Sequence, residues 1–144
     1  MATVDDLDEV IEQFDLAQGE LVKGNAEPAM KLFSHRGDVT LANPFGPPAH
    51  GWEHVAETMD HASSLCRDGE LVGSEIVAKY VTAELAYVVE IERPKAKLGG
   101  REEITPWALR ATMIFRPEEG TWKIVHRHAD PITTPRAAES VIQQ

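Results

Sequence analysis

Two histidines near the end of the chain have the side chains that acid–base chemistry needs. His126 and His128 are two positions apart, so in an extended strand their side chains share a face, which Trp122, Ile124 and Asp130 continue. The tryptophan and the isoleucine predict that this face is the inner one. An imidazole has a pKa of about 6.5, so either histidine could exchange protons near neutral pH. We therefore predict that His126 and His128 line or rim a cavity, where they act as acid or base or shape it through local hydrogen bonds.

Three charged residues lie in other segments that read as strands. Arg110 could bind a carboxylate or an enolate oxygen, and Glu90, if buried alone, would have a raised pKa suited to a general base. The alternative is structural: Arg110 forms an ion pair with Glu90, Glu92 or Asp130, or the two glutamates lie on a solvated hairpin edge. Alternation leaves open whether Arg110 or its neighbour Leu109 faces the interior.

Several large apolar side chains are the natural lining of a ligand cavity. We expect a small, mostly apolar ligand there, because such cavities are largely hydrophobic with a few polar groups. The candidate ligand-binding residues are Phe45, Trp52, Met59, Trp107, Met113 and, as a polar group, Glu90.

The remaining histidines and the one cysteine give little support for a metal centre. His50 and His54 are four residues apart but span the expected start of a helix, where their side chains need not converge. Cys66 continues an apolar helical stripe and is predicted to lie in the core. We predict no metal and no other cofactor.

The order of elements predicts how these residues are positioned. Apolar residues recur every three or four positions between Val4 and Leu21, which predicts a helix that Thr3 can cap. A shorter helix capped by Asn25 and a third helix after Gly51 are also predicted. The expected strands are residues 38–42, 71–81, 85–93, 104–115 and 122–129, with a basic connection at 94–100. Early helices followed by a meander of strands indicate an α+β fold, with the helices on one face of a curved sheet.

Length and charge narrow the class of protein. The 144 residues suit a single domain, which we place at 1–130 with a C-terminal tail at 131–144. With 14 basic and 24 acidic side chains the net charge is −10, so nucleic acid and anionic membranes are unfavourable partners. No apolar run approaches the roughly 18 residues of a membrane span, and the N-terminus does not resemble a signal peptide. We expect a cytoplasmic protein.

Three local motifs, in this order, resemble the nuclear transport factor 2-like superfamily. They are the segment 37–46 ending in Asn-Pro-Phe-Gly, Gly51 opening a helix, and the strand at 120–130. The resemblance implies the cone-shaped α+β fold of ketosteroid isomerase and of SnoaL-type polyketide cyclases: N-terminal helices on a curved, mainly antiparallel sheet that encloses a pocket. It also implies a homodimer formed through the sheet.

The catalytic residues of ketosteroid isomerase do not carry over. The general base of that family corresponds to Asn43, and an amide cannot abstract a proton. The tyrosine and the acid of its oxyanion hole fall on Ala17 or a neighbour and on Met113 or Ile114. The resemblance therefore supports the fold without that mechanism.

The segment from Asn43 to Gly51 is also similar to limonene epoxide hydrolase. In that family the matching asparagine helps to hold the attacking water. Its tyrosine falls on Leu41, its last-strand aspartate on His128, and its Arg-x-Asp pair on Glu90-Ile91-Glu92. The resemblance implies water activation by His128 together with Asn43.

We predict a protein that binds a small apolar ligand, with acid–base catalysis by His128 assisted by His126, Asn43 and Arg110. An enzyme of this kind would be an isomerase, a cyclase, a dehydratase or a hydrolase that needs no cofactor. One alternative is a water-activating hydrolase, and another is a non-catalytic ligand-binding or assembly module. A pocket walled entirely by apolar groups, with both histidines outside it, would favour the binding module.

Overall fold

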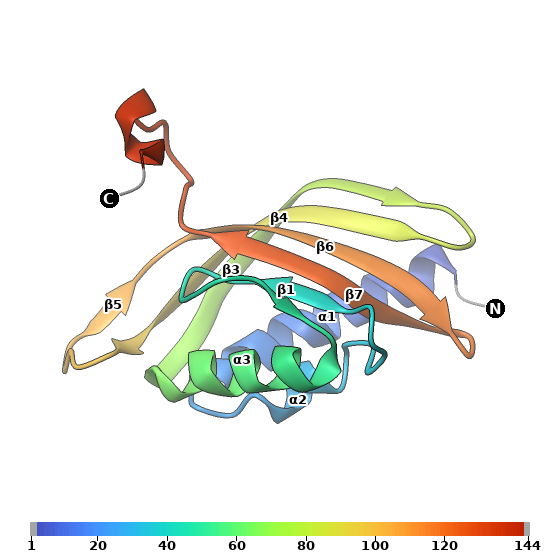
Figure 1. Ribbon diagram of the computed structural model, residues 1–144, viewed down its shortest axis with the longest axis horizontal. Coiled ribbons are helices and arrows are strands. Elements are labelled where there is room, and N and C mark those ends of the chain that lie inside the picture. Colours follow the sequence, from blue (N-terminus) through green and yellow to red (C-terminus); the bar gives the residue numbers. More distant parts are fainter. Residues whose placement is uncertain (1–2, 143–144) are drawn as a thin grey trace.

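A long first helix lies across one face of a curved sheet in the computed structural model, which describes residues 3–142 (Figure 1). The elements follow in the order α1 (Val4–Leu21), α2 (Glu27–Met30), β1 (Thr40–Ala42), β2 (Ala49–His50), α3 (Trp52–Ser64), β3 (Cys66–Val81), β4 (Ala86–Leu98), β5 (Ile104–Pro106), β6 (Leu109–Glu118), β7 (Thr121–Asp130) and the 3₁₀ helix η1 (Ala138–Val141). This confirms the predicted α+β class.

Helix α1 begins and ends where its apolar spacing predicts. Thr3 accepts a hydrogen bond from the Asp6 amide at 3.2 Å, and the Asp6 carboxylate accepts one from the Thr3 amide at 3.0 Å. This reciprocal capping satisfies two amide donors that a helix start leaves free. The helix buries Leu7, Val10, Ile11, Phe14 and Ala17 against the sheet. Helix α2 ends at Met30 and has Ala26 at its N-cap, but the predicted capping residue, Asn25, accepts a hydrogen bond from the Glu27 amide at 3.3 Å.

The sheet has the strand order β2-β1-β7-β6-β4-β3, and the short β5 pairs with the far end of β4. Strand β1 runs parallel to β7, whereas the other neighbours are antiparallel. The long strands bend over α1, and α3 lies beside β1 (Figure 1). The inner face of this bend is where a cavity can form.

Three strand predictions are wrong in their extent. Strand β4 continues to Leu98 through the expected connection at 94–100, because its far half pairs with both β3 and β5. The expected strand 104–115 is divided into β5 and β6, so that β4 exchanges one partner for the other near Pro94. Strand β3 begins at Cys66, earlier than the expected 71–81, and contains a bulge at Asp68, where φ is 54°. These irregularities bend the sheet.

Strand β7 contains a bulge that changes which side chains face inward. Phe115 pairs with Ile124 and Ile114 pairs with His126, so Val125 is the extra residue. Before the bulge Trp122 and Ile124 are buried, whereas after it Arg127 and Ala129 are buried. The prediction that a single inner face runs from Trp122 to His128 is therefore wrong.

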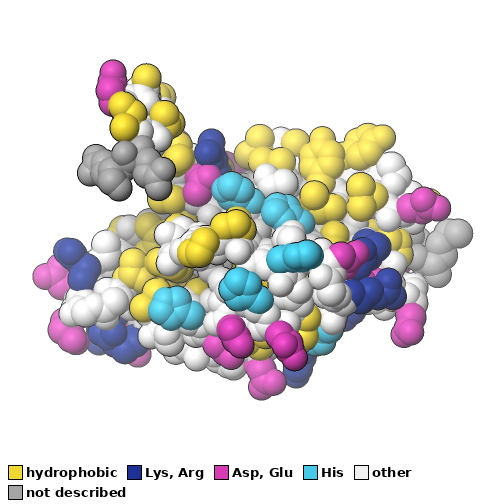
Figure 2. Space-filling view, viewed as in Figure 1, with side chains coloured by type: hydrophobic (Ala, Val, Ile, Leu, Met, Phe, Trp, Pro, Cys, Tyr) yellow, Lys and Arg dark blue, Asp and Glu magenta, His cyan; other side chains and the backbone are white. Residues whose placement is uncertain are grey.

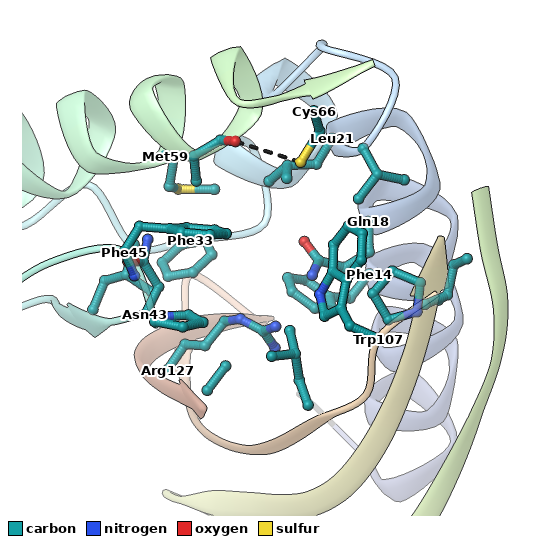
Figure 3. A pocket seen from close by; sticks show the side chains of 18 residues that line it. Phe14, Gln18, Leu21, Phe33, Asn43, Phe45, Met59, Cys66, Trp107 and Arg127 are labelled. Carbon is teal, nitrogen blue, oxygen red and sulfur yellow. Dashed lines mark hydrogen bonds between the residues drawn. The ribbon is translucent and has the colours of Figure 1, made fainter. Parts of the chain in front are cut away.

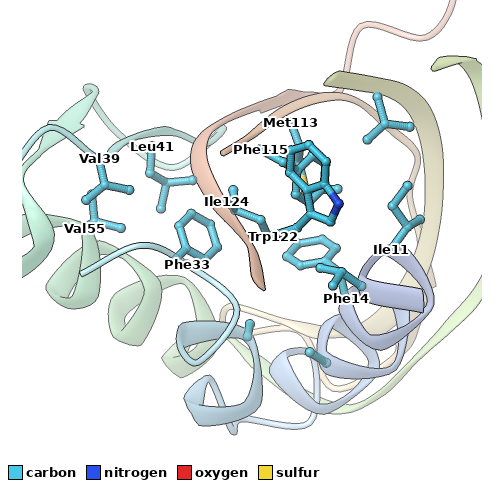
Figure 4. Close-up of a cluster of buried hydrophobic side chains, with 14 of the residues drawn as sticks. Ile11, Phe14, Phe33, Val39, Leu41, Val55, Met113, Phe115, Trp122 and Ile124 are labelled. Carbon is cyan, nitrogen blue, oxygen red and sulfur yellow. The ribbon is translucent and has the colours of Figure 1, made fainter. Parts of the chain in front are cut away.

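The main core lies between α1, α2 and the sheet (Figure 4). Trp122 is at its centre, and its indole nitrogen donates a hydrogen bond to the Thr3 carbonyl at 2.9 Å. Phe14, Phe33 and Phe115 are each at most 1% exposed. The core therefore fixes α1 on the sheet near the start of the helix, while the C-terminal end of α1 borders the cavity described below.

Gly69 provides a test of the close contact between the α1–α2 connection and the strands. A Cβ atom at this position would lie 2.6 Å from the Val22 carbonyl oxygen and 2.7 Å from the Lys95 carbonyl oxygen. Backbone atoms cannot yield as side chains do, so we expect Gly69→Ala to lower the free energy of unfolding by about 1–3 kcal/mol. Chemical denaturation measures this change. Gly37→Ala is the control, because nothing lies within 4 Å of its Cβ position; equal effects of the two substitutions would contradict the expectation.

The chain leaves the sheet after Asp130 and projects from the body (Figure 1). Helix η1 buries none of its residues. Within residues 3–142, no helix has the length and apolarity that crossing a membrane requires.

Candidate functional site

A cavity lies between α1, α3 and the inner face of the sheet (Figure 3). About 70 Å³ of it is open to the centre of a water molecule, and one water needs roughly 10–15 Å³ by this measure. The wall comprises 18 residues, most of them apolar. Phe45 and Met59 lie on one side of the cavity and Trp107 on the other (Figure 3). The space suits several waters or a small apolar molecule.

Arg127 and Gln18 form the main polar part of the wall, together with a carboxylate behind them. The two terminal nitrogens of Arg127 each donate to a Glu92 oxygen at 2.7 Å. The Gln18 amide nitrogen donates to the same carboxylate at 3.2 Å. Arg127 is 5% exposed and Glu92 is 0% exposed, so this is a buried bidentate ion pair.

Burial and pairing act in opposite directions on the two partners. Burial favours the neutral carboxyl of Glu92, but Arg127 outweighs it and holds the Glu92 pKa below its ordinary value. Burial likewise opposes the charge of Arg127, and the Glu92 carboxylate holds the guanidinium pKa above its usual value. The Arg127 guanidinium also lies 4.9 Å from the centre of the Phe14 ring, a favourable cation–π distance.

Glu90 is a second buried carboxyl beside this pair. It lies two residues from Glu92 on the same face of β4 and is 0% exposed. Burial, with the neighbouring Glu92 carboxylate, raises the pKa of Glu90 to about 9. Glu90 therefore favours its neutral form near neutral pH, and neither of its side-chain oxygens has a hydrogen-bond partner among the described residues. Burial also raises the pKa of Asp15 on α1, whose carboxylate accepts a hydrogen bond from Ser74 at 2.7 Å.

Asn43 lies beside Phe45 and across the cavity from Gln18, in the loop that follows β1 (Figure 3). Its side-chain oxygen accepts a hydrogen bond from the Phe45 amide at 3.0 Å, which fixes the turn. The carboxamide NH₂ is therefore left as a donor at the cavity wall. Trp107 adds an indole N–H to the same wall.

The predicted ligand-binding residues divide into two groups. Phe45, Met59 and Trp107 line the cavity, as does Asn43, which was predicted as a catalytic residue. The other three lie outside the cavity lining: Met113 is fully buried in the core, Glu90 is buried behind the wall, and Trp52 stacks on His35 at 3.8 Å.

The bulge in β7 places the predicted catalytic histidines on the outer face of the sheet. His126 is 2.7 Å from the Thr40 hydroxyl, and its pKa is lowered by burial and by the nearby His128. His128 lies 3.1 Å from the Asp130 carboxylate. Their position inside a cavity was predicted wrongly, and a catalytic role for either stays a prediction.

Arg110 also lies on the outer face, since Leu109 and Ala111 on either side of it are buried. Its side chain donates to Asp130 at 2.7 Å. Burial favours the neutral Asp130 carboxyl, but Arg110 outweighs it and lowers the Asp130 pKa. Of the open alternatives, the structure shows the ion pair with Asp130.

Histidine and apolar side chains are prominent on the molecular surface (Figure 2). On the outer face of the sheet Tyr80 and Tyr87 stack with their ring centres 5.7 Å apart, and both are substantially exposed. Among residues 3–142, no three His, Cys, Asp or Glu side chains come close enough to form a metal site. Pairing of two copies through the sheet stays a prediction.

Sequence reasoning missed the two polar groups that matter most, Gln18 and Arg127. Gln18 follows Phe14 by four residues and precedes Leu21 by three, so it interrupts the apolar stripe of α1. That interruption was an available signal for a buried polar group. Arg127 had no such signal, because its inward direction depends on the bulge at Val125.

Comparison with known proteins identifies the family of this fold. A family model described as a SnoaL-like domain matches residues 21–133. No curated protein matches the sequence. A nuclear transport factor 2-like protein from Salmonella enterica has a TM-score of 0.76 at 16% identity, covering 94% of each chain.

Two other solved structures have the same fold. A protein from Streptomyces avermitilis, described as a candidate dehydratase of the nuclear transport factor 2-like family, has a TM-score of 0.70 at 20% identity, covering 91% of this chain and 96% of that one. A ketosteroid isomerase-like protein from Erwinia carotovora has a TM-score of 0.67 at 17% identity, covering 90% and 93%. These likenesses support the fold, and the family model covers most of the sequence. The chain belongs to the SnoaL-like domain family.

Proposed function

We propose that this SnoaL-like chain binds a small, mostly apolar molecule in the cavity between α1, α3 and the sheet. The observation that carries the proposal is the wall itself: apolar side chains surround the space, and Arg127, Gln18 and Asn43 supply polar groups to it. Such a combination is typical of ligand sites, where apolar contacts give affinity and a few polar groups fix orientation.

The surroundings of the cavity favour binding over histidine-based chemistry. His126 and His128 lie outside the cavity lining, which meets one of the two conditions that favour a binding module; the other, an entirely apolar wall, is not met, because Arg127 is part of the wall. Glu92 accepts hydrogen bonds from Arg127 and Gln18 and lies outside the cavity lining, so a ligand meets Arg127 before it meets Glu92. A ligand oxygen would meet the N–H donors of Arg127 and Asn43 instead.

Filling the cavity is expected to abolish ligand binding without unfolding the chain. Ala62 on α3 lines the cavity, and Ala62→Leu would place three further carbon atoms in it. In a thermal-shift screen of steroids, terpenoid epoxides and aromatic polyketides, a compound that stabilises the wild type should lose its shift in this variant. Binding at about 100 times the dissociation constant stabilises a protein by about 2.7 kcal/mol, a shift that is easily measured.

The matched control is Ala83→Leu, the same substitution in the exposed turn between β3 and β4. It should keep the full ligand-induced shift. A shift that survives Ala62→Leu would show that the compound binds elsewhere. A screen without any stabilising compound would count against the proposed function.

A water-activating hydrolase is a second candidate, and one observation favours it. Two buried carboxyls, Glu90 and Glu92, lie behind the Arg127 guanidinium, which is itself part of the cavity wall. The similarity to limonene epoxide hydrolase implies two acids and one arginine, with one acid on the last strand and the arginine on a middle strand. In this chain the arginine is on the last strand, β7, and both acids are on β4. Burial raises the pKa of Glu90, whereas Arg127 holds the pKa of Glu92 below its ordinary value, which is the difference that an acid and a base need.

Epoxide opening tests this second candidate. Glu90 and Glu92 lie outside the cavity lining, so this reaction requires the wall to open until substrate and water reach them. The acid would then protonate the epoxide oxygen, water would attack a ring carbon, and the base would take the proton from water, giving a diol. Limonene epoxide incubated with the wild type should then yield diol, and Glu90→Gln should remove that activity. Absence of diol from the wild type, together with a positive thermal shift, would contradict the hydrolase and leave only the binding function.

A further inference from the structure

The polar wall of the cavity holds one positive charge and, at neutral pH, one negative charge. Arg127 lines the cavity and is paired with Glu92 through two hydrogen bonds of 2.7 Å. Both side chains are almost completely buried. Their charges therefore cancel at the cavity wall, where little solvent screens either of them.

Arg127 can still bind an oxygen. A guanidinium has five N–H donors, of which Glu92 occupies two, so about three are left for other acceptors. Asn43 adds its NH₂ group, because its oxygen is held by the Phe45 amide. Gln18 offers its carbonyl, because its nitrogen donates to Glu92. The wall thus offers mainly donors, without a free positive charge.

A carboxylate ligand would gain little from this wall. It would lose its hydration on entry and would find the charge of Arg127 already neutralised by Glu92. A ketone, an ester or another uncharged oxygen compound loses much less hydration and can accept the same hydrogen bonds. The wall therefore favours uncharged ligands over carboxylates of the same size.

We propose that Glu92, supported by Glu90, determines the specificity of the cavity by neutralising Arg127, so that the site selects uncharged ligands with an acceptor oxygen and rejects carboxylates. This proposal rests on the proposed ligand-binding function.

Glu90 can neutralise Arg127 when the charge of Glu92 is removed. It lies on the same inward face of β4 as Glu92 and is equally buried. Two carboxyls this close in a buried site carry a single negative charge between them, so loss of the Glu92 charge allows Glu90 to ionise beside Arg127. Asp15 on α1 faces the same cluster but is held by Ser74 and is less buried. Only the removal of both glutamates should leave the Arg127 charge free.

Acetophenone and benzoate are suitable probes, because they share a ring and nearly the same shape but differ in charge. Each is titrated into the full ¹⁵N-labelled chain and followed by NMR at the Asn43 and Phe45 amides and the Trp107 indole. For the wild type we expect acetophenone to bind about tenfold or more tightly than benzoate. In the Glu90→Gln/Glu92→Gln variant, benzoate should bind about tenfold or more tightly than it binds the wild type.

Arg127→Gln added to that double variant is the control, and it should return benzoate to weak binding. The wild-type comparison needs no variant, so a double variant that fails to fold leaves the test intact. Equal affinities of the wild type for both probes would overturn the charge selection and leave the binding function standing. If neither probe perturbed any signal of the cavity wall, the binding function would fail and the charge selection with it.

Discussion

Replacing Arg127 by methionine is expected to lower the free energy of unfolding by about 3–5 kcal/mol. The substitution leaves the Glu92 carboxylate buried with Gln18 as a remaining donor, and it removes the contact with the Phe14 ring. Breaking a buried ion pair from one side is costly, because an uncompensated charge stays in a site that excludes water. Urea unfolding of the wild type and of the variant measures the difference.

Two matched variants separate the ion pair from ordinary packing. Arg127→Met combined with Glu92→Met should recover much of the lost stability, because an apolar pair of similar volume often replaces a buried ion pair without net cost. Arg110→Met breaks the more exposed pair with Asp130, in which the arginine side chain is 54% exposed, and should cost less than about 1 kcal/mol. An Arg127→Met variant no less stable than Arg110→Met would contradict the buried pair.

The helices were predictable because each is specified by its own residues. In α1 the apolar spacing and the Thr3 cap act within a few residues of one another, so local sequence determines the element. The helix after Gly51 is likewise marked by one glycine and one apolar stripe. Strand β4 extends beyond its prediction because Pro94 and the basic residues after it are held by β3 and β5, which lie elsewhere in the sequence.

The direction of side chains in the sheet depends on partners that a sequence pattern does not show. In β4 both alternating sets contain apolar residues, such as Val88 on one face and Ile91 on the other. The pattern therefore does not show that Glu90 lies on the face that points inward. In β7 one extra residue at Val125 exchanges the two faces. That exchange moves His128 to the outside and Arg127 to the cavity, which is why the candidate site differs from its prediction while the fold does not.

Glu90 should make the folded protein less stable as the pH rises through neutrality. Burial, with Glu92 beside it, holds the Glu90 pKa at about 9, whereas a glutamate in an unfolded chain has a pKa of about 4.3. Between these values the folded state keeps a proton that the unfolded state releases, so the free energy of unfolding falls with increasing pH. The slope from this one group approaches about 1.4 kcal/mol per pH unit.

Other shifted groups define the window in which this slope is clearest. The lowered pKa of Glu92 affects stability below the unfolded value of about 4.3, and the lowered pKa of His126 makes stability fall as the pH drops below about 6.5. The raised pKa of Asp15 acts in the same direction as that of Glu90. The measurement is therefore best made between about pH 7 and 8.5, below the folded-state pKa of Glu90.

Glu90→Gln should flatten this dependence, because an amide keeps the shape and the donor capacity of the protonated carboxyl but cannot ionise. Urea unfolding across the window should show the variant gaining on the wild type with each step in pH and exceeding it at the upper end. Glu57→Gln, on the exposed face of α3, removes a carboxyl without removing the buried proton and should follow the wild-type slope. If Glu90→Gln kept that slope as well, Glu90 would already be ionised at neutral pH. Two ionised glutamates would then lie beside the single positive charge of Arg127, and the cavity wall would carry a net negative charge.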